Sequence, residues 1–421
     1  MRSLFGLLKK PSAAGGASLR ASSPAEHRPA AGLITIDVEA SAPGPVEEAR
    51  LVVRGPGGLT FAKPLSLGAE PVSFWLGAHG QLLPDGPVRL ELELQDGAGA
   101  TLARQALTLQ VHNKGELARK VAESLRRSGV PVFLDGLADS SFYDYDDPSV
   151  RPWFERSEGE ALAHIDGLLS KGEIDAAEAE ALRGFLRDGF TVLPDVVDEA
   201  HLARLNAALD AAVAEKHEGY EWGSSQRMHG LHEKHPAVRE LWAHPKVLRM
   251  LGLIFGAPAL PCQSLTYVFG SQQDHHQDTI HLTPFPAGYM CGVWTALEDV
   301  QPQSGELVVY PGSHRLKRIY TRTVDTPKVI DGDFGPLGDK VMPVWSEMIA
   351  QLGATPVTYQ PKAGTVLIWH ENLMHAGSPR ADLSRSRRSV VCHYFADGAV
   401  AYYDSLGVPG VTHLPGQFGQ G

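Results

Sequence analysis

Cysteine is scarce in this chain, with three among 421 residues and none of them in a Cys-x-x-Cys pair. An odd and sparse set argues against a disulfide framework and a thiolate zinc site, and it is typical of a reducing compartment. Long hydrophobic runs are also missing, because no stretch approaches the roughly 20 apolar residues that a membrane-spanning helix needs. We therefore expect a cytoplasmic protein without a transmembrane segment.

An excess of basic charge is missing as well. The chain has 38 Lys and Arg against 49 Asp and Glu, which gives a net charge of −11 at pH 7. An acidic protein repels the phosphate backbone of nucleic acids, so nucleic-acid binding is not expected as its main role. A small anionic ligand is still compatible with this composition, because one local arginine can outweigh a distant, screened surface charge.

The N-terminal residues lack the core of a signal peptide. The apolar run from Leu4 to Leu8 is too short for one, and two lysines follow it. Residues 11–31 are rich in Ala, Gly, Ser and Pro and have little apolar content. We predict a flexible leader over residues 1–31, although its basic, amphipathic tip could also touch a membrane or a partner protein.

Glycine and proline are plentiful, with 44 and 30 residues, which favours many turns and short strands over a helical bundle. In residues 32–113 apolar and polar positions alternate with a period of two, as at Val88, Leu90, Leu92 and Leu94. That period is typical of strands with one buried face. We predict a small β-sandwich of six or seven strands here, immunoglobulin-like, that acts as a binding or spacer module.

Helical patterns follow the sandwich. Apolar residues recur every four positions from Leu117 to Leu125, which indicates a helix near the start of a helical linker region over residues 114–182. The next part of the chain begins with helices and then turns to strands. The pattern predicts a second domain over residues 183–404, an all-β core with helical support, and a C-terminal tail over residues 405–421.

The stretch HHQDTIHL contains three histidines and one aspartate. On a strand, side chains two positions apart point to one face, so His276 and Asp278 would aim an imidazole and a carboxylate at one point, while His275 points away. Two such ligands suit Fe(II), and a third completes the 2-His-1-carboxylate set that leaves positions open for oxygen chemistry. The pair alone is weak evidence, since the chain has 18 histidines.

The third ligand should come from a distant strand. His375 follows a buried-strand run, Val366–Trp369, after a short turn, and His370 on that strand is its rival. Further on, Arg387 and Arg388 begin another strand and point to opposite faces. An inward arginine there would pair with the far carboxylate of a 2-oxo diacid that chelates the metal. Periodicity leaves open which of the two arginines points inward.

Five motifs occur in order: the His-x-Asp pair, a Gly-x-Trp strand, GELVVYPGSH, AGTVLIWHENLMHAGS and RRSVVCHYF. In this order and at these separations they resemble the phytanoyl-CoA dioxygenase family of Fe(II)- and 2-oxoglutarate-dependent oxygenases. The opening DGFTVLPDVV also resembles the usual start of that family. The resemblance covers roughly residues 183–400, and with the strand pattern it predicts a C-terminal double-stranded β-helix of the jelly-roll or cupin type.

The resemblance also implies roles for individual residues and a set of cofactors, namely Fe(II), 2-oxoglutarate and O₂. The implied site residues are His276, Asp278 and His375 for the metal, Arg387 for the 5-carboxylate of 2-oxoglutarate, and Trp294, Gln263 and Ser378 for further cosubstrate contacts. The chain departs from the family pattern after the distal histidine. One extra residue there moves the serine from the second to the third position beyond the histidine.

We predict an Fe(II)- and 2-oxoglutarate-dependent dioxygenase that hydroxylates a small molecule and releases succinate and CO₂. An appended sandwich is compatible with a carbohydrate or a carrier-linked substrate. Related halogenases replace the triad carboxylate with a small residue, so the presence of Asp278 favours hydroxylation over halogenation.

Several alternatives stay open on the sequence alone. Desaturation, epimerisation and ring closure use the same iron centre, and the motifs do not separate them. A jelly roll that only binds a glycan or another ligand is an alternative of a different class. The sequence also leaves open whether four further histidines contact the substrate: His229, His232, His235 and His281.

Overall fold

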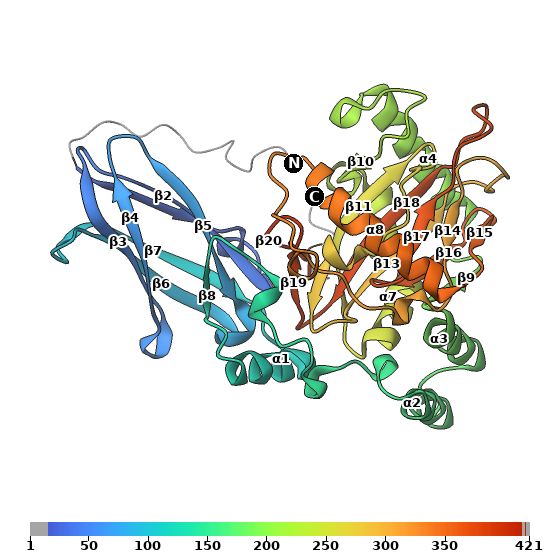
Figure 1. Ribbon diagram of the computed structural model, residues 1–421, viewed down its shortest axis with the longest axis horizontal. Coiled ribbons are helices and arrows are strands. Elements are labelled where there is room, and N and C mark those ends of the chain that lie inside the picture. The colour runs from blue at the N-terminus through green and yellow to red at the C-terminus, as the bar shows by residue number, and fades with distance from the viewer. Residues whose placement is uncertain (1–15, 415–416, 418–421) are drawn as a thin grey trace.

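The computed structural model of the protein describes residues 16–414 and residue 417. Figure 1 shows two lobes side by side, an N-terminal lobe made of strands and a larger C-terminal lobe made of strands and helices. The chain is therefore mainly β with supporting helices, as the sequence predicts. Within the described residues, no helix is both long and apolar enough to cross a membrane.

The N-terminal lobe consists of two antiparallel four-stranded sheets, β1-β2-β5-β8 and β4-β3-β6-β7. The strands are β1 (Ser18–Ser22), β2 (Leu33–Ser41), β3 (Val46–Arg54), β4 (Thr60–Leu67), β5 (Val72–His79), β6 (Gly86–Gln95), β7 (Thr101–Val111) and β8 (Phe133–Asp135). An apolar core lies between the sheets, where Ile36, Leu51, Leu76 and Leu90 are fully buried. The two-residue alternation explains this core, because each strand turns every second side chain inward.

The leader prediction is wrong for the described part of residues 1–31. Strand β1 pairs with β2, and the Ala30 N–H donates to the Gln110 carbonyl at 2.9 Å. Pairing at a sheet edge uses main-chain groups, so a segment with few apolar side chains can still form a strand. Residues 1–15, which include the basic tip, lie outside the described residues.

The segment between the lobes is packed rather than free. Its helices are α1 (Gly115–Arg127), α2 (Glu158–Ser170) and α3 (Ala176–Asp188), with short 3-10 turns between α1 and α2. Tyr143 stacks on Phe285 of the C-terminal lobe with ring centroids 4.8 Å apart. The Trp153 indole donates to the Ile254 carbonyl at 2.8 Å. These side chains belong to the same apolar core as the C-terminal lobe, so the segment is an integral part of that lobe.

A six-stranded antiparallel sheet forms the centre of the C-terminal lobe, in the order β10-β11-β18-β13-β16-β9. Its strands are β9 (Phe190–Leu193), β10 (Met228–His229), β11 (Ala259–Tyr267), β13 (Met290–Ala296), β16 (Val366–His370) and β18 (Ser389–Ala396). Strands β13, β16 and β18 are buried along their whole length. Burial on both faces explains why their sequences are continuous apolar runs without alternation.

The two faces of this sheet are covered differently. Helices α4 (Glu199–Ala214), α5 (Leu231–Lys234), α6 (Pro236–Trp242) and α7 (Pro245–Phe255) share an apolar core with one face. The small sheet β15-β14-β17 packs on the other face, around Trp294 and Trp369. The remaining strands are β12 (Thr283–Phe285), β14 (Leu307–Val309), β15 (Val357–Tyr359), β17 (His375–Gly377), β19 (Val400–Tyr403) and β20 (Val408–Pro409). The candidate site lies on the face that the small sheet covers.

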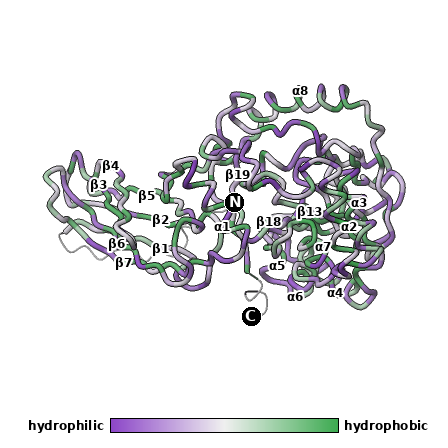
Figure 2. Tube along the Cα trace, turned by 90° about the horizontal axis from the view of Figure 1, so that it is seen from below, coloured by the Kyte–Doolittle hydropathy of each residue, from purple (hydrophilic) through white to green (hydrophobic). Residues whose placement is uncertain are grey.

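The long helix α8 (Gly335–Leu352) is not expected from the sequence, which predicts strands in this part of the chain. Glycines near its start and Pro343 inside it disfavour a helix locally. Leu337, Val341 and Trp345 bury one stripe of the helix against the lobe, so tertiary packing overrides the local preference. Figure 2 shows α8 running along an outer edge of the C-terminal lobe.

The tail prediction for residues 405–421 is also wrong in its described part. Strand β20 pairs with β19, and Leu414 packs in a small buried cluster with Ala31 and Leu260. Leu414 therefore contacts both lobes. Residues 415–416 and 418–421 lie outside the described residues.

Candidate metal and cosubstrate site

Three residues of the sequence-predicted triad come together on the face under the small sheet. His276 and His375 form an isolated antiparallel bridge, with N–H···O bonds of 3.0 and 3.1 Å between their main chains. The Nε2 atoms of His276 and His375 lie 3.8 and 3.7 Å from Oδ1 of Asp278. One ligand atom from each residue lies within 4.8 Å of the other two, which is the spacing of a three-residue metal site.

The strand premise behind the His-x-Asp pair is wrong. Only His276 has a bridge partner, and Asp278 opens a 3-10 turn, Asp278–Ile280. The intervening Gln277 nevertheless points away from the triad. Its amide oxygen accepts a bond from the Trp345 indole at 3.0 Å, and its amide nitrogen donates to the Lys317 carbonyl at 3.2 Å. The backbone is extended at Gln277, so alternation holds locally without a strand.

Main-chain carbonyls fix the orientation of both imidazoles. Nδ1 of His276 lies 2.8 Å from the Asp274 carbonyl, and Nδ1 of His375 lies 2.9 Å from the Leu373 carbonyl. A carbonyl can only accept, so each Nδ1 carries the proton and each Nε2 keeps its lone pair. The two lone pairs face Asp278 Oδ1. This is the usual way in which proteins set the tautomer of metal-binding histidines.

The second oxygen of Asp278 is held by the protein. The Trp369 indole donates to Oδ2 at 2.8 Å, and His393 Nε2 lies 3.6 Å from the same atom. Oδ1 is therefore the oxygen that faces the two imidazoles. The sequence analysis missed Trp369 and His393 as site residues. The shared strand parity of Arg387 and His393 was the signal that could have found the histidine.

Burial and neighbouring side chains set the protonation states of His276 and Asp278. Desolvation, together with the nearby His375, lowers the pKa of His276 to about 3. Burial opposes ionisation of Asp278, but the imidazoles of His375, His393 and His276 outweigh it and hold the pKa of that carboxyl below its usual range. Neutral imidazole and ionised carboxylate are the forms that bind a cation, so the site is ready for a metal near neutral pH.

Arg387 is a buried cation beside the triad. The residue is 2% exposed, and its Nε has no hydrogen-bond partner among the described residues. Its guanidinium lies over the rings of Tyr267 and Trp294, 5.5 and 5.6 Å from the ring centroids. Burial lowers the pKa of Arg387 to about 10. A buried guanidinium with aromatic neighbours and no ion pair among the described residues is suited to receive an anionic group.

The structure decides between the two arginines and between the two distal histidines. Arg388 points away and pairs with Asp210 at 2.9 Å. His370 points away from the triad, with its Nε2 3.1 Å from Glu155 Oε1.

Of the other three predicted cosubstrate residues, two line the cavity and one does not. Gln263 and Trp294 line the same cavity as the triad, and Gln263 Nε2 lies 3.2 Å from His393 Nδ1. Ser378 is not among the lining residues, and its hydroxyl donates to Glu306 Oε2 at 2.8 Å. The structure therefore does not bring Ser378 to the site.

The four undecided histidines also lie in different places. His229 and His281 line the cavity, and Nδ1 of His281 is 3.1 Å from the Ser405 hydroxyl. His232 stacks on Trp242 in the core, with ring centroids 3.7 Å apart. His235 precedes α6 and does not line the cavity. His229 lies in strand β10 and His232 in helix α5, and His235 directly follows α5.

The cavity that opens from the triad has a volume of about 1730 Å³. Helix α8 forms an apolar wall with Leu337, Val341, Met342 and Trp345. Another wall comes from residues 216–234, with charged side chains from Lys216, Glu218, Arg227 and Lys234. The volume exceeds the roughly 300–1,000 Å³ of ordinary small-molecule pockets. The cavity can therefore hold a large organic molecule with one end at the triad.

Comparison with known families gives one match, over residues 185–389, to the family described as Phytanoyl-CoA dioxygenase (PhyH). "Phytanoyl-CoA dioxygenase domain-containing protein 1" of Danio rerio is 33% identical over 162 residues, which is 37% of this chain and 53% of the relative. "Phytanoyl-CoA dioxygenase, peroxisomal" of Rattus norvegicus is 23% identical over 244 residues, 55% of this chain and 63% of the relative. The chain thus spans about half the length of the Danio rerio relative.

Two solved structures illustrate the structural likeness. The non-heme alpha ketoglutarate dependent carbocyclase SnoK from nogalamycin biosynthesis is 23% identical with a TM-score of 0.43, and the match covers 53% of this chain and 85% of that one. EctD from S. alaskensis with bound Fe is 22% identical with a TM-score of 0.41, and the match covers 53% of this chain and 77% of that one.

Proposed function

From the match of residues 185–389 to the phytanoyl-CoA dioxygenase family, we propose that the chain is an Fe(II)- and 2-oxoglutarate-dependent oxygenase. One observation carries the proposal. His276, Asp278 and His375 direct two imidazole nitrogens and one carboxylate oxygen at one point, and the unpaired guanidinium of Arg387 lies in the same cavity. A cation site beside an anion site is what a metal-chelating 2-oxo diacid requires.

The donor set fits Fe(II). Two Nε2 lone pairs and Oδ1 form a 2-His-1-carboxylate set, and Trp369 and the Asp274 and Leu373 carbonyls keep these three groups in position. Bound iron would supply dioxygen activation coupled to decarboxylation of 2-oxoglutarate to succinate and CO₂. The residues themselves supply a neutral imidazole at His276, a fixed carboxylate and a buried site for the metal.

We assign 2-oxoglutarate binding to Arg387, with Trp294 and Gln263 beside it. The guanidinium can pair with the carboxylate that is distant from the metal, and burial makes that ion pair strong. Gln263 acts next to His393, which its amide contacts. Ser378 has no part in this assignment, because its hydroxyl is bonded to Glu306.

The reaction we propose is hydroxylation of a small molecule. The presence of Asp278 supports it over halogenation, since the carboxylate fills the position that a halide would need. The cavity of about 1730 Å³ supports a large substrate, such as a glycosylated or carrier-linked one. Its walls favour a molecule with an apolar body, to lie against α8, and a polar end, to lie against the charged side chains of residues 216–234. Desaturation, epimerisation and cyclisation would use the same residues and are the alternatives.

We also propose a fold type for each lobe and a cellular location for the protein. Two facing sheets around the triad support a double-stranded β-helix for the C-terminal lobe. Two packed four-stranded sheets support an immunoglobulin-like sandwich for the N-terminal lobe, extended by β1 to begin near residue 18. The three cysteines are free and buried, which supports a reducing, cytoplasmic location.

The test is succinate formation from 2-oxoglutarate with added Fe(II), compared in wild type, Asp278→Ala and Asp146→Ala. Asp146 is an exposed control in the linker. We expect succinate from wild type and the control, and at least a ~100-fold lower rate from Asp278→Ala, because the metal loses the carboxylate ligand of the triad.

Arg387→Gln should raise the KM for 2-oxoglutarate by about 100-fold with metal binding retained. Absence of both Fe(II) binding and succinate in wild type would overturn the proposal in favour of a ligand-binding jelly roll.

A further inference from the structure

A second group of metal-type residues lies outside the triad. Glu155, His370 and Glu371 place one ligand atom each within 4.8 Å of one another. Arg318 already lies among them. Its Nε and Nη2 donate to Glu371 Oε1 at 3.0 and 2.9 Å, and Nη2 also donates to Glu155 Oε1. The positive charge between the carboxylates is therefore a guanidinium, and this group is a buried ion network rather than a second metal site.

The inner part of the network is fully buried, and its outer members, Arg318 and Glu155, are 19% and 21% exposed. The Glu371 side chain is 0% exposed and the His370 side chain is 1% exposed. His370 Nδ1 accepts from the Asn372 N–H at 3.0 Å, so the ring proton is on Nε2 and is donated to Glu155 Oε1 at 3.1 Å. Glu371 Oε1 also accepts the Gly288 N–H at 2.8 Å. Removing one charge would leave its partners buried and unpaired.

The same loop positions the triad. The carbonyl of Glu371 accepts from both the N–H and the hydroxyl of Thr279, at 3.1 and 3.3 Å, directly after Asp278. The hydroxyl of Thr279 also bonds Asn372 Oδ1 at 3.1 Å. Two residues further along the loop, the Leu373 carbonyl fixes the tautomer of His375. The loop from His370 to His375 therefore connects the ion network to two of the three triad residues.

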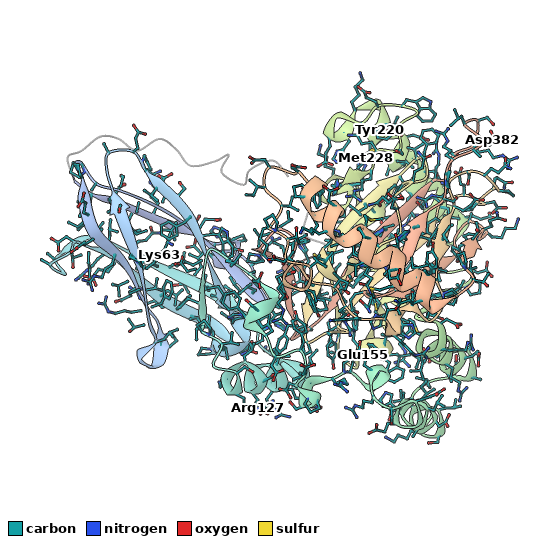
Figure 3. The ribbon with its side chains drawn as sticks, in the orientation of Figure 1. Lys63, Arg127, Glu155, Tyr220, Met228 and Asp382 are labelled. Carbon is teal, nitrogen blue, oxygen red and sulfur yellow. The ribbon has the colours of Figure 1, made fainter. Side chains whose placement is uncertain are left out.

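One member of the network comes from outside the family domain. Glu155 ends the short turn Trp153–Glu155 in the segment between α1 and α2, thirty residues before the matched region begins at residue 185. Figure 3 labels Glu155 at the junction between that segment and the C-terminal lobe. The other members, Arg318, His370 and Glu371, lie within the matched region.

We propose that Glu155 is a positioning residue for the metal site. Through Arg318, His370 and Glu371 it holds the loop from His370 to His375, and so sets the placement of Asp278 and His375 toward the metal. The segment before residue 185 thus belongs to the functional unit and is more than a spacer to the sandwich. This inference rests on the proposed iron site, and it concerns the chain's own residues rather than the reaction.

The experiment compares Co(II) binding to the full-length metal-free protein in wild type, Glu155→Gln and Glu158→Gln. Glutamine keeps the shape of Glu155 without its charge, and Glu158 is an exposed control three residues away. Affinity is measured by competition with a chelator, and the coordination geometry by the visible absorption of Co(II). We expect Glu155→Gln to bind Co(II) about 10- to 100-fold more weakly with a changed spectrum, while Glu158→Gln matches wild type.

A second pair of variants decides the case where Glu155→Gln does not fold. Thr279→Val removes the hydroxyl that bonds the loop and keeps the side-chain shape, and Thr279→Ser keeps the hydroxyl. Weaker Co(II) binding with Thr279→Val, rescued by Thr279→Ser, supports the positioning route. A folded Glu155→Gln with wild-type affinity and spectrum overturns it, as does a folded Thr279→Val with both unchanged. Loss of Co(II) binding in wild type itself would instead refute the proposed iron site.

Discussion

At the scale of the residue, Trp369 shows how one side chain serves both packing and the site. Trp369 pairs across the strands with Gly292, and a Cβ added at Gly292 would lie 2.1 Å from the indole ring. The ring therefore occupies the space that a side chain at 292 would fill, and from there its N–H reaches Asp278 Oδ2. Fixing one carboxylate oxygen leaves the other free to face the two imidazoles.

Trp369→Phe tests this role. Phenylalanine keeps most of the apolar contact but has no N–H, so Asp278 Oδ2 loses its donor and the carboxylate can rotate. We expect about 10-fold weaker metal binding, measured by chelator competition. Trp222→Phe serves as the control, because Trp222 is 67% exposed and does not line the cavity that holds the triad. Equal affinities for both variants would show that the indole N–H does not orient the carboxylate.

At the scale of the element, the central strands of the six-stranded sheet carry the site on one face and the helical core on the other. In β13, Val293 belongs to the core shared with the helices and Trp294 to the cluster under the small sheet. Residue parity thus decides which side chains can reach the cavity. Gly292 is the one position of β13 without a side chain, and the close approach of Trp369 requires it.

Gly292→Ala should therefore destabilise this element. A methyl group there meets the rigid indole of Trp369, so β13 and β16 must separate or the ring must move, at a cost of about 1–3 kcal/mol of unfolding free energy. Urea unfolding measures it. Gly184→Ala in α3 is the matched control, because its nearest neighbours would be 4.0 Å away. That variant should be neutral or more stable by up to ~1 kcal/mol. A loss no larger for Gly292→Ala than for the control would contradict the packing argument.

At the scale of the whole molecule, the two lobes are joined by specific polar contacts as well as by the chain. His112 Nε2 lies 2.9 Å from Asp397 Oδ2, and the Gln81 amide donates to the Gly398 carbonyl at 3.2 Å. His79, at the end of β5, bonds the Tyr143 hydroxyl at 3.0 Å, and Tyr143 stacks on Phe285. We expect the lobes to unfold as one cooperative unit.

Buried histidines give this unit an acid-labile component. Burial lowers the pKa of His79 to about 4, and burial likewise lowers the pKa values of His232 and His413 to about 4. In the unfolded chain a histidine titrates near 6.5. Between these pH values the unfolded state binds more protons, so the unfolding free energy is complete above about pH 6.5 and falls as the pH drops toward 4.

Urea unfolding at pH 7.5 and pH 4.5 measures this loss, and His79 alone should account for on the order of 3 kcal/mol. His79→Gln should show a smaller difference between the two pH values than wild type. His27→Gln should keep the full difference, because His27 is exposed. If acidification lowers the unfolding free energy of His79→Gln and His27→Gln equally, His79 does not contribute to the acid sensitivity.

The sequence predicts those elements whose burial produces a local pattern of apolar residues. Period-two alternation predicted the strands of the first lobe, and apolar runs predicted the central strands of the second. Both patterns arise because a buried position favours an apolar residue. Helix α8 was not predicted, because its glycines and Pro343 disfavour a helix and tertiary packing stabilises it. Strand β1 was not predicted, because main-chain pairing with β2 needs no apolar pattern.

For the site, the sequence by itself determined which residue types are available and in which order, and the resemblance of that order to a known family implied His276, Asp278, His375 and Arg387 as site residues. Only the tertiary structure decided which residues meet. It put Trp369 and His393 on Asp278, turned His370 toward Glu155, and held Ser378 at Glu306. The reason is physical: these partners lie between 72 and 215 residues apart along the chain, and no local period encodes which distant segments pack together.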